Sequence, residues 1–170
     1  MRRLWLSLLL AITLTPAIAE NAVFTFRPGK SFGPVALGAS RDQMLQALSG
    51  WAYDVDRRVV GDTYFFPPDG QPRLLIGVGT DDKVKEVTLH DKAFRMTGAS
   101  SIGPGCSKDD LLKQFGKPSS DALTEHGGYW DYNSKGVCFH FPSSRETPRF
   151  GKGRVESVSL YKPGASRYQK

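Results

Sequence analysis

The stretch GASRDQMLQAL at residues 38–48 decides the predicted fold, because a close relative of it, GCSKDDLLKQF, recurs at residues 105–115. The two stretches are identical or similar in character at every position, at an offset of 67 residues. Two more pairs of segments match: LLIGV (74–78) with VCFHF (137–141), and KVKEVTLH (83–90) with RVESVSLY (154–161). Three matched segments in the same order predict an internal duplication.

Each copy is predicted to open with a short helix. Ser40 and Ser107 are the expected N-caps, and Gln43 and Asp110 follow three residues later, at the spacing of a capping box. Apolar side chains then form one stripe on each helix: Met44, Leu45 and Leu48 in the first, and Leu111, Leu112 and Phe115 in the second. Helices of two to three turns are marginal alone, so packing must hold them.

Segments with the alternation of β-strands follow each helix. Residues 74–78, 84–90 and 137–141 read as strands, and further strands are expected at 52–57, 63–66, 121–125 and 129–132. The fold class predicted is α+β, with two tandem repeats that each combine a helix with about four antiparallel strands. The helices are expected to pack on one face of the sheet or sheets, and the other face can stay open to solvent. The expected repeats span residues 20–96 and 97–170.

The N-terminus, residues 1–19, has the pattern of a secretory signal peptide. Arg2 and Arg3 precede an apolar run at residues 4–14, and Ala17-Ile18-Ala19 provides the small residues that signal peptidase requires. As a helix the apolar run would span about 16 Å, roughly half of a bilayer core, so no membrane span is expected. We therefore expect a periplasmic or secreted protein, cleaved near Ala19.

Net charge limits the classes of partner that are expected, and the cysteine count predicts a disulfide. Removal of Arg2 and Arg3 with the leader leaves 21 basic and 17 acidic residues, a net charge of +4. In an exported protein this modest excess fits a solvated surface or weak contact with anionic surfaces, and nucleic acid is not an expected partner. An even cysteine count in an oxidising compartment predicts a disulfide between Cys106 and Cys138.

The sequence contains no complete catalytic or metal-binding pattern. His90, His126 and His140 lie far apart and lack metal-ligand spacing, so neither a metal nor a cofactor is expected. Cys138 and His140 share a strand face, as a thiol and its base would, but the expected disulfide competes with this interpretation. The protein is therefore predicted not to be an enzyme.

One string in the second copy resembles a known module. Residues 105–118 give G-x-S-x-x-D-L-L-x-x-F-G-x-P, and Trp130-Asp131-Tyr132 and Gly136-Val137-x-Phe139 follow. This string is similar to the small exported αβ module of SmpA/OmlA (BamE-type) envelope proteins and of β-lactamase inhibitor protein, itself a tandem repeat. The resemblance implies an open, often concave sheet face that binds a protein.

The two groups imply different roles. The inhibitor family implies an inhibitor or immunity-type antagonist of another exported protein, whereas the BamE-type family implies a structural accessory of cell-envelope or outer-membrane assembly. The chain departs from the second group in lacking a lipid-attachment cysteine, and from the first in having its cysteine pair only in the second copy.

Aromatic side chains on the strands are the predicted contacts with such a partner. Tyr and Trp commonly anchor protein interfaces, although strand alternation must place about half of them in the core. Tyr64, Phe66, Trp130 and Tyr132 are predicted to be exposed, and Asp69 is placed at the tip of the Pro67-Pro68-Asp69-Gly70 turn. The sequence thus predicts an exported, non-catalytic protein-binding module.

Overall fold

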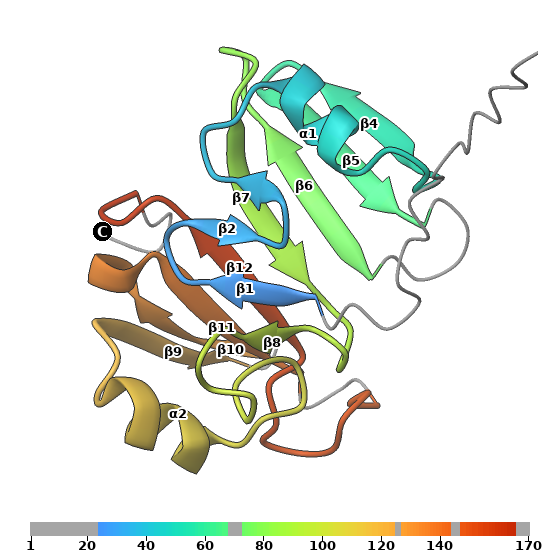
Figure 1. Cartoon of the computed structure of the whole chain (residues 1–170). Coiled ribbons are helices and arrows are strands. Elements are labelled where there is room, and N and C mark those ends of the chain that lie inside the picture. The colour runs from blue at the N-terminus through green and yellow to red at the C-terminus, as the bar shows by residue number, and fades with distance from the viewer. Residues whose placement is uncertain (1–23, 68–72, 125–126, 144–146, 166–170) are drawn as a thin grey trace, which may run out of the picture.

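A computed structural model describes residues 24–67, 73–124, 127–143 and 147–165. Its main element is one antiparallel sheet of eight strands (Figure 1). In spatial order these are β4 (Asp54–Arg58), β5 (Gly61–Phe66), β6 (Leu74–Val78), β7 (Val84–Leu89), β12 (Ser157–Tyr161), β11 (Val137–Phe141), β10 (Gly127–Tyr132) and β9 (Ser120–Thr124). The pairing of β7 with β12, in which Val87 lies opposite Leu160, joins the two groups of four strands into one sheet.

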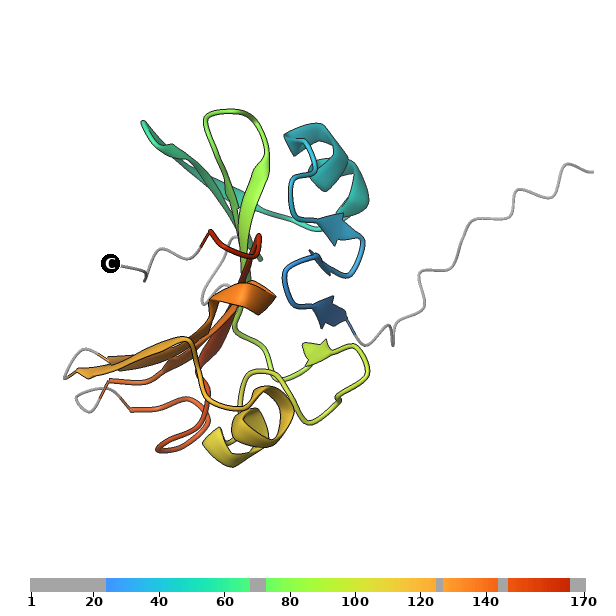
Figure 2. The same cartoon turned by 90° about the vertical axis from the view of Figure 1, so that its left-hand side faces the viewer.

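A second, smaller sheet has four strands in the order β3 (Val35–Ala36), β2 (Ser31–Phe32), β1 (Thr25–Arg27) and β8 (Arg95–Met96). Its first three strands come from the residues before the first helix, and β8 joins β1 in parallel, with Met96 opposite Phe26. The small sheet lies against one face of the large sheet (Figure 2). Helices α1 (Arg41–Ala47) and α2 (Lys108–Phe115) lie on the same side, towards its two ends, and a 3-10 turn, η1 (Asn133–Lys135), precedes β11.

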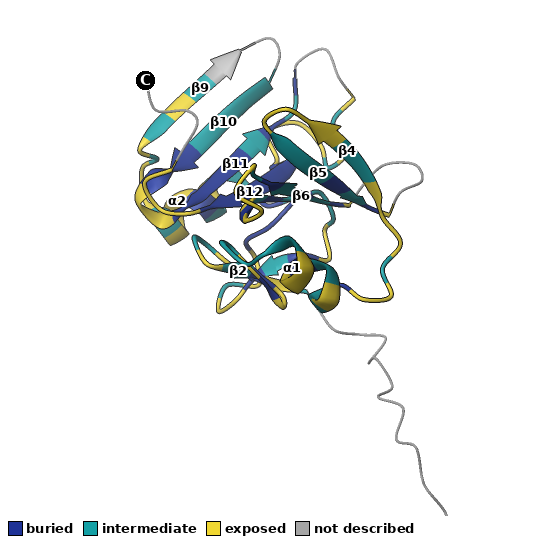
Figure 3. Cartoon of the chain, turned by 90° about the horizontal axis from the view of Figure 1, so that it is seen from above, coloured by how far each residue is buried: buried dark blue, intermediate teal, exposed yellow. Residues whose placement is uncertain are grey.

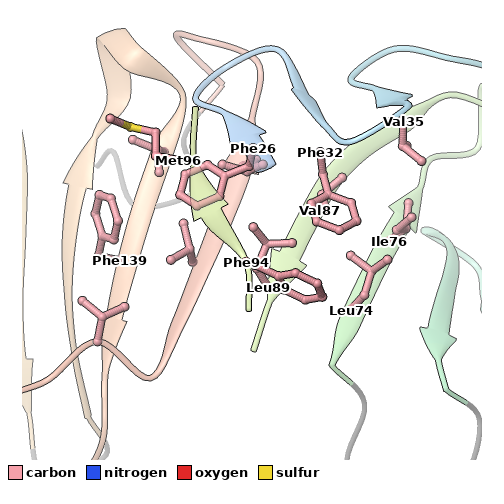
Figure 4. Close-up of a cluster of buried hydrophobic side chains, with 14 of the residues drawn as sticks. Phe26, Phe32, Val35, Leu74, Ile76, Val87, Leu89, Phe94, Met96 and Phe139 are labelled. Carbon is pink, nitrogen blue, oxygen red and sulfur yellow. The ribbon is translucent and has the colours of Figure 1, made fainter. Parts of the chain in front are cut away.

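The hydrophobic core fills the space between the two sheets. Phe26 points from β1 into this core beside Met96, and Phe32 points from β2 towards side chains of β6 and β7 (Figure 4). Phe32 contacts Phe94 in an edge-to-face arrangement, with ring centroids 4.9 Å apart. The helices add Met44 and Leu111, both fully buried, to the same cluster. One continuous core therefore supports both sheets and both helices.

The predicted α+β class, built from two helix-plus-sheet repeats with helices as the covering layer, is wrong. The described chain is mostly β: it forms two sheets, and its two α-helices have only seven and eight residues. The middle of the large sheet is covered by the small sheet, whose strands of two or three residues are too short to show a period in the sequence. The duplication itself stays a prediction, and the predicted signal peptide lies outside the described residues.

Both helix starts were predicted correctly from local sequence. The Ser40 and Ser107 side chains accept from the backbone N–H groups of Gln43 and Asp110, and the side chains of those residues accept from the N-cap N–H groups in return. These reciprocal bonds satisfy donors that the first turn of a helix leaves open. Two hydrogen bonds of the Asp110 carboxylate with Ser107 also lower the pKa of Asp110.

The large sheet is bent into an arch (Figure 3). Its two edges, formed by β4 with β5 and by β9 with β10, curve away from the covering layer, so the concave side faces away from the helices and the small sheet (Figures 2 and 3). The β4–β5 hairpin therefore forms one wall of the arch, and its tip lies at the rim.

Candidate functional site

The aromatic residues predicted to contact a partner belong instead to the core. Tyr64, Phe66 and Tyr132 are buried, and Trp130 is partly buried, with its ring 5.6 Å from that of Phe141. Burial raises the pKa of Tyr132 to about 12, and its hydroxyl donates to the carbonyl of Gly116 at 3.0 Å. The prediction that these side chains are exposed is wrong. Asp69 lies outside the described residues.

Strand register explains this error. In β5, Tyr64 pairs with Ile76 and Phe66 with Leu74, so both aromatic rings share the face of two fully buried aliphatic side chains. Phe65, between them, points to the concave side and is half-buried. Three consecutive aromatic residues show no alternation of apolar and polar side chains. Only the pairing with the neighbouring strand therefore decides which of them face the core.

The two cysteines are buried and not bonded to each other. Cys106 packs in the core together with Val137 and Phe139, whereas Cys138, between those two residues on β11, points to the opposite face of the sheet. A bridge would have to pass through the sheet, so the predicted disulfide is wrong. Burial also raises the pKa of the Cys106 thiol, which disfavours the nucleophilic thiolate.

A hydrogen-bonded chain crosses the concave face where the two groups of strands meet. The Ser159 hydroxyl lies 3.0 Å from the Thr88 hydroxyl and 3.1 Å from Nε2 of His140. Next to it the buried Tyr161 hydroxyl donates to the Asp131 carboxylate. Although serine and histidine can form a nucleophile and its base, Ser159 is buried on the central strand β12, so this chain links β7, β12 and β11 structurally.

The strongest candidate for a functional site is the tip of the β4–β5 hairpin, which is not among the residues predicted from the sequence. Arg58 pairs with Gly61, so Val59 and Val60 form a two-residue loop, and they are 96% and 82% exposed. Such loops usually contain Asn, Asp or Gly, because their backbone must turn sharply. Two β-branched apolar residues therefore have no local folding reason to occupy this loop.

The hairpin around this tip is held firmly. Gly61 has φ +128°, and a Cβ there would lie 2.2 Å from the carbonyl oxygen of Val78, so only glycine fits. One residue pair behind the tip, Asp62 forms an ion pair with Arg41 of α1 at 3.1 Å. The Arg58 guanidinium lies 2.5 Å from the Asp56 carboxylate, and the pKa of Arg58 is raised by this hydrogen bond and charge. The tip is thus presented on an anchored support.

The concave wall below the tip is also partly apolar. Phe65 and Leu75 lie opposite each other on β5 and β6, and both are half-buried on the concave face. We call Val59, Val60, Phe65 and Leu75 the hairpin surface. Charged residues along the edge strand β4, such as Asp56 and Arg58, oppose edge-to-edge pairing with another sheet. The charged edge therefore disfavours the addition of a strand from another protein to β4.

The described residues form neither a metal site nor a membrane-spanning helix. Within residues 24–67, 73–124, 127–143 and 147–165, no group of three or more His, Cys, Asp or Glu side chains could hold a metal ion. None of the helices in those ranges has the length and apolar character that crossing a membrane requires.

No family model matches the chain, and no curated protein matches it. Among solved structures, it is similar to the uncharacterized protein yfeY from Escherichia coli, with 12% identity and a TM-score of 0.49 over 82% of this chain and 99% of that one. It is also similar to a DUF4309 family protein (YjgB) from Bacillus subtilis, with 11% identity and a TM-score of 0.42 over 73% of this chain and 78% of that one. At these TM-scores neither structure bears on the function of this chain.

Proposed function

We propose that this chain is an exported, non-catalytic protein that binds another exported protein through the hairpin surface and acts as its inhibitor or immunity-type antagonist. The observation that carries the proposal is the exposure of Val59 and Val60, 96% and 82%, at a tip whose turn does not require them. Isolated exposed apolar residues are ordinary on protein surfaces, but an adjacent pair on a projecting, anchored turn is suited to insertion into a pocket.

The chemistry of the tip defines the partner. Arg57 and Arg58 are exposed directly before the two valines; because Arg58 is paired with Asp56, Arg57 supplies the net positive charge of this flank. A complementary partner has an apolar pocket whose rim carries carboxylates, because opposite charges across an interface favour encounter and orientation. If that pocket belongs to an active site or a binding cleft, the inserted hairpin keeps the partner's own ligand out. The chain would inhibit its partner in this way.

The hairpin tip serves as the anchor of a larger contact. Stable interfaces bury about 800 Å² on each partner, more than two valines can supply. Phe65 and Leu75 form a second apolar area on the same wall, at the end of β5 and β6 away from the tip. A partner that contacts both the tip and this area covers the length of the hairpin.

The test uses the mature protein, residues 20–170, as bait for periplasmic extract and culture medium, with quantitative mass spectrometry. The wild type is compared with the double variant Val59→Ser/Val60→Ser. Leu112→Ser is the matched control, because Leu112 is also an exposed apolar residue (42%) but lies on α2, in the covering layer. One stoichiometric partner should be retained by the wild type and the control and lost by the double variant.

Affinity and inhibition are then measured with the purified partner. Loss of two anchoring side chains should weaken binding by roughly 100-fold, and the wild type should block the partner's activity. A partner that the double variant binds as tightly as the wild type, or the absence of any stoichiometric partner, would refute the proposal. A component of outer-membrane assembly that binds through the same surface without loss of activity would favour the envelope-accessory role instead.

A further inference from the structure

An open pocket of about 470 Å³ lies at the end of β6 and β7 that is far from the hairpin tip. Its lining residues are Arg73, His90, Asp91, Lys92, Arg149 and Phe150. They come from three segments: the residue before β6, the turn after β7 and the loop between β11 and β12. The volume is within the usual range for small-molecule sites.

The charge of the lining favours an anion. Among the described residues of the lining, three cationic side chains face one carboxylate, that of Asp91. Glu156, outside the lining, forms an ion pair with Arg149 at 3.6 Å, which still leaves one positive charge in excess among these residues. Burial and the nearby Arg149 charge lower the pKa of His90 to about 4, so its ring is neutral at pH 7 and adds no charge of either sign.

Backbone hydrogen bonds fix the frame of the pocket. The His90 N–H donates to the Arg73 carbonyl at 2.8 Å, and the Arg149 guanidinium donates to the His90 carbonyl at 3.3 Å. The Asp91 carboxylate accepts from the backbone N–H of Ala93 at 2.8 Å. The three segments are thus held together before any ligand arrives, which lowers the entropic cost of binding.

Two cations of the lining can adapt to a ligand. Arg73 is 68% exposed and reaches Asp91 with a single guanidinium nitrogen, Nη1, at 3.3 Å. The exposed Lys92 ammonium lies 5.0 Å from the centre of the Phe150 ring. Exposed ion pairs of this kind contribute little to stability. An oxyanion can therefore replace Asp91 as the partner of Arg73, and approach Lys92, with little loss of folding free energy. The Phe150 ring offers an apolar surface beside the charged head.

We infer that this pocket binds a small organic anion, whose phosphate or carboxylate head contacts Arg73 and Lys92 and whose apolar body packs against Phe150. Guanidinium groups favour such planar or tetrahedral oxyanions, because several of their N–H donors can engage one anion. The inference does not depend on Val59 and Val60, since the pocket and the hairpin tip lie at opposite ends of β6.

Three probes separate the parts of the recognition: phenyl phosphate, inorganic phosphate as the head alone, and phenol as the body alone. Each is titrated into the ¹⁵N-labelled mature protein and followed by NMR chemical shifts. Phenyl phosphate should give saturable shifts around His90 and Arg149, with a dissociation constant of about 1 mM or tighter. Inorganic phosphate should bind the same residues more weakly, and phenol should not saturate them.

Variants locate the binding. Arg73→Gln and Lys92→Gln should each weaken phenyl phosphate binding by about tenfold, because each removes a charge-assisted hydrogen bond. Lys113→Gln, which removes an exposed lysine on α2, should leave it unchanged, and circular dichroism verifies that all three variants fold. The inference is overturned if phenyl phosphate does not saturate the pocket, if phenol binds equally well, or if neither pocket variant changes the affinity.

Discussion

Replacing Phe32 by alanine tests whether the small sheet supports the large one. Phe32 is one of only two residues in β2, it is fully buried, and its ring packs edge-to-face with Phe94 and tilted against Phe24. The strand itself contributes few backbone hydrogen bonds, so its effect on stability comes from this one side chain in the core. A covering layer made of helices alone would leave Phe32 without such a role.

The expected loss follows from burial. A phenylalanine-to-alanine change in a core costs about 3–5 kcal/mol, through lost transfer free energy and the cavity that remains. The aromatic contacts place Phe32 in the middle of that range, about 4 kcal/mol, which is a large part of the 5–15 kcal/mol that stabilises a typical domain. With a urea m-value of about 2 kcal/mol/M, the midpoint should fall by about 2 M.

Urea unfolding of the mature protein, followed by tryptophan fluorescence and circular dichroism, measures this shift. Val60→Ala is the control: Val60 is 82% exposed, and its truncation should change stability by no more than about 0.5 kcal/mol. A loss below about 1 kcal/mol for Phe32→Ala would refute the packing of the small sheet on the large one.

Three further predictions concern other parts of the molecule. His90 has a pKa of about 4 in the folded protein and an ordinary pKa of 6.5, so the unfolded chain binds a proton more readily. The free energy of unfolding should therefore fall by up to about 3 kcal/mol as the pH drops from 6.5 to 4. His90→Gln should remove that part of the pH dependence, measured by urea unfolding at each pH. Thiol titration should find two reactive groups, Cys106 and Cys138, in the denatured, unreduced protein and none in the native state; zero in the denatured protein would restore the disulfide. Gly136→Ala should lower the melting temperature more than Gly50→Ala does. Both glycines have positive φ, but only at Gly136 would the added Cβ lie 2.2 Å from a backbone carbonyl oxygen. Equal decreases in melting temperature would contradict this steric explanation.

The sequence is informative where a signal is local. Ser107 and Asp110 determine a helix start through contacts three residues apart, and the structure confirms it. The alternation of apolar residues at 74–78 and 137–141 likewise predicts strands that the structure contains as β6 and β11. In each case one turn of helix or one strand carries its own physical pattern.

The candidate site could be predicted only in part. The class of surface, an open concave sheet face, was an expectation from resemblance, but the residues placed on it were not those that the structure exposes. Val59 and Val60 carried a signal that was overlooked, since two β-branched residues stand where a tight turn usually has Asn or Gly. The pocket around Arg73 and Arg149 has no sequence signal, because its parts are far apart in the chain.

The sequence by itself determined the helix caps and the main strands, because each depends on neighbours within a few residues; the leader stays a prediction from its local pattern. Tertiary structure alone decided which side of each strand is buried, what covers the sheet and whether the cysteines meet. Phe26 lies beside Met96, and Tyr64 faces the core because Ile76 is its partner. These outcomes depend on pairing between distant segments, and a shift of one residue in such a pairing exchanges the faces of a strand. Val59 and Val60 at the hairpin tip depend on both: their sequence is unusual for a tight turn, and the tertiary structure leaves them exposed to solvent.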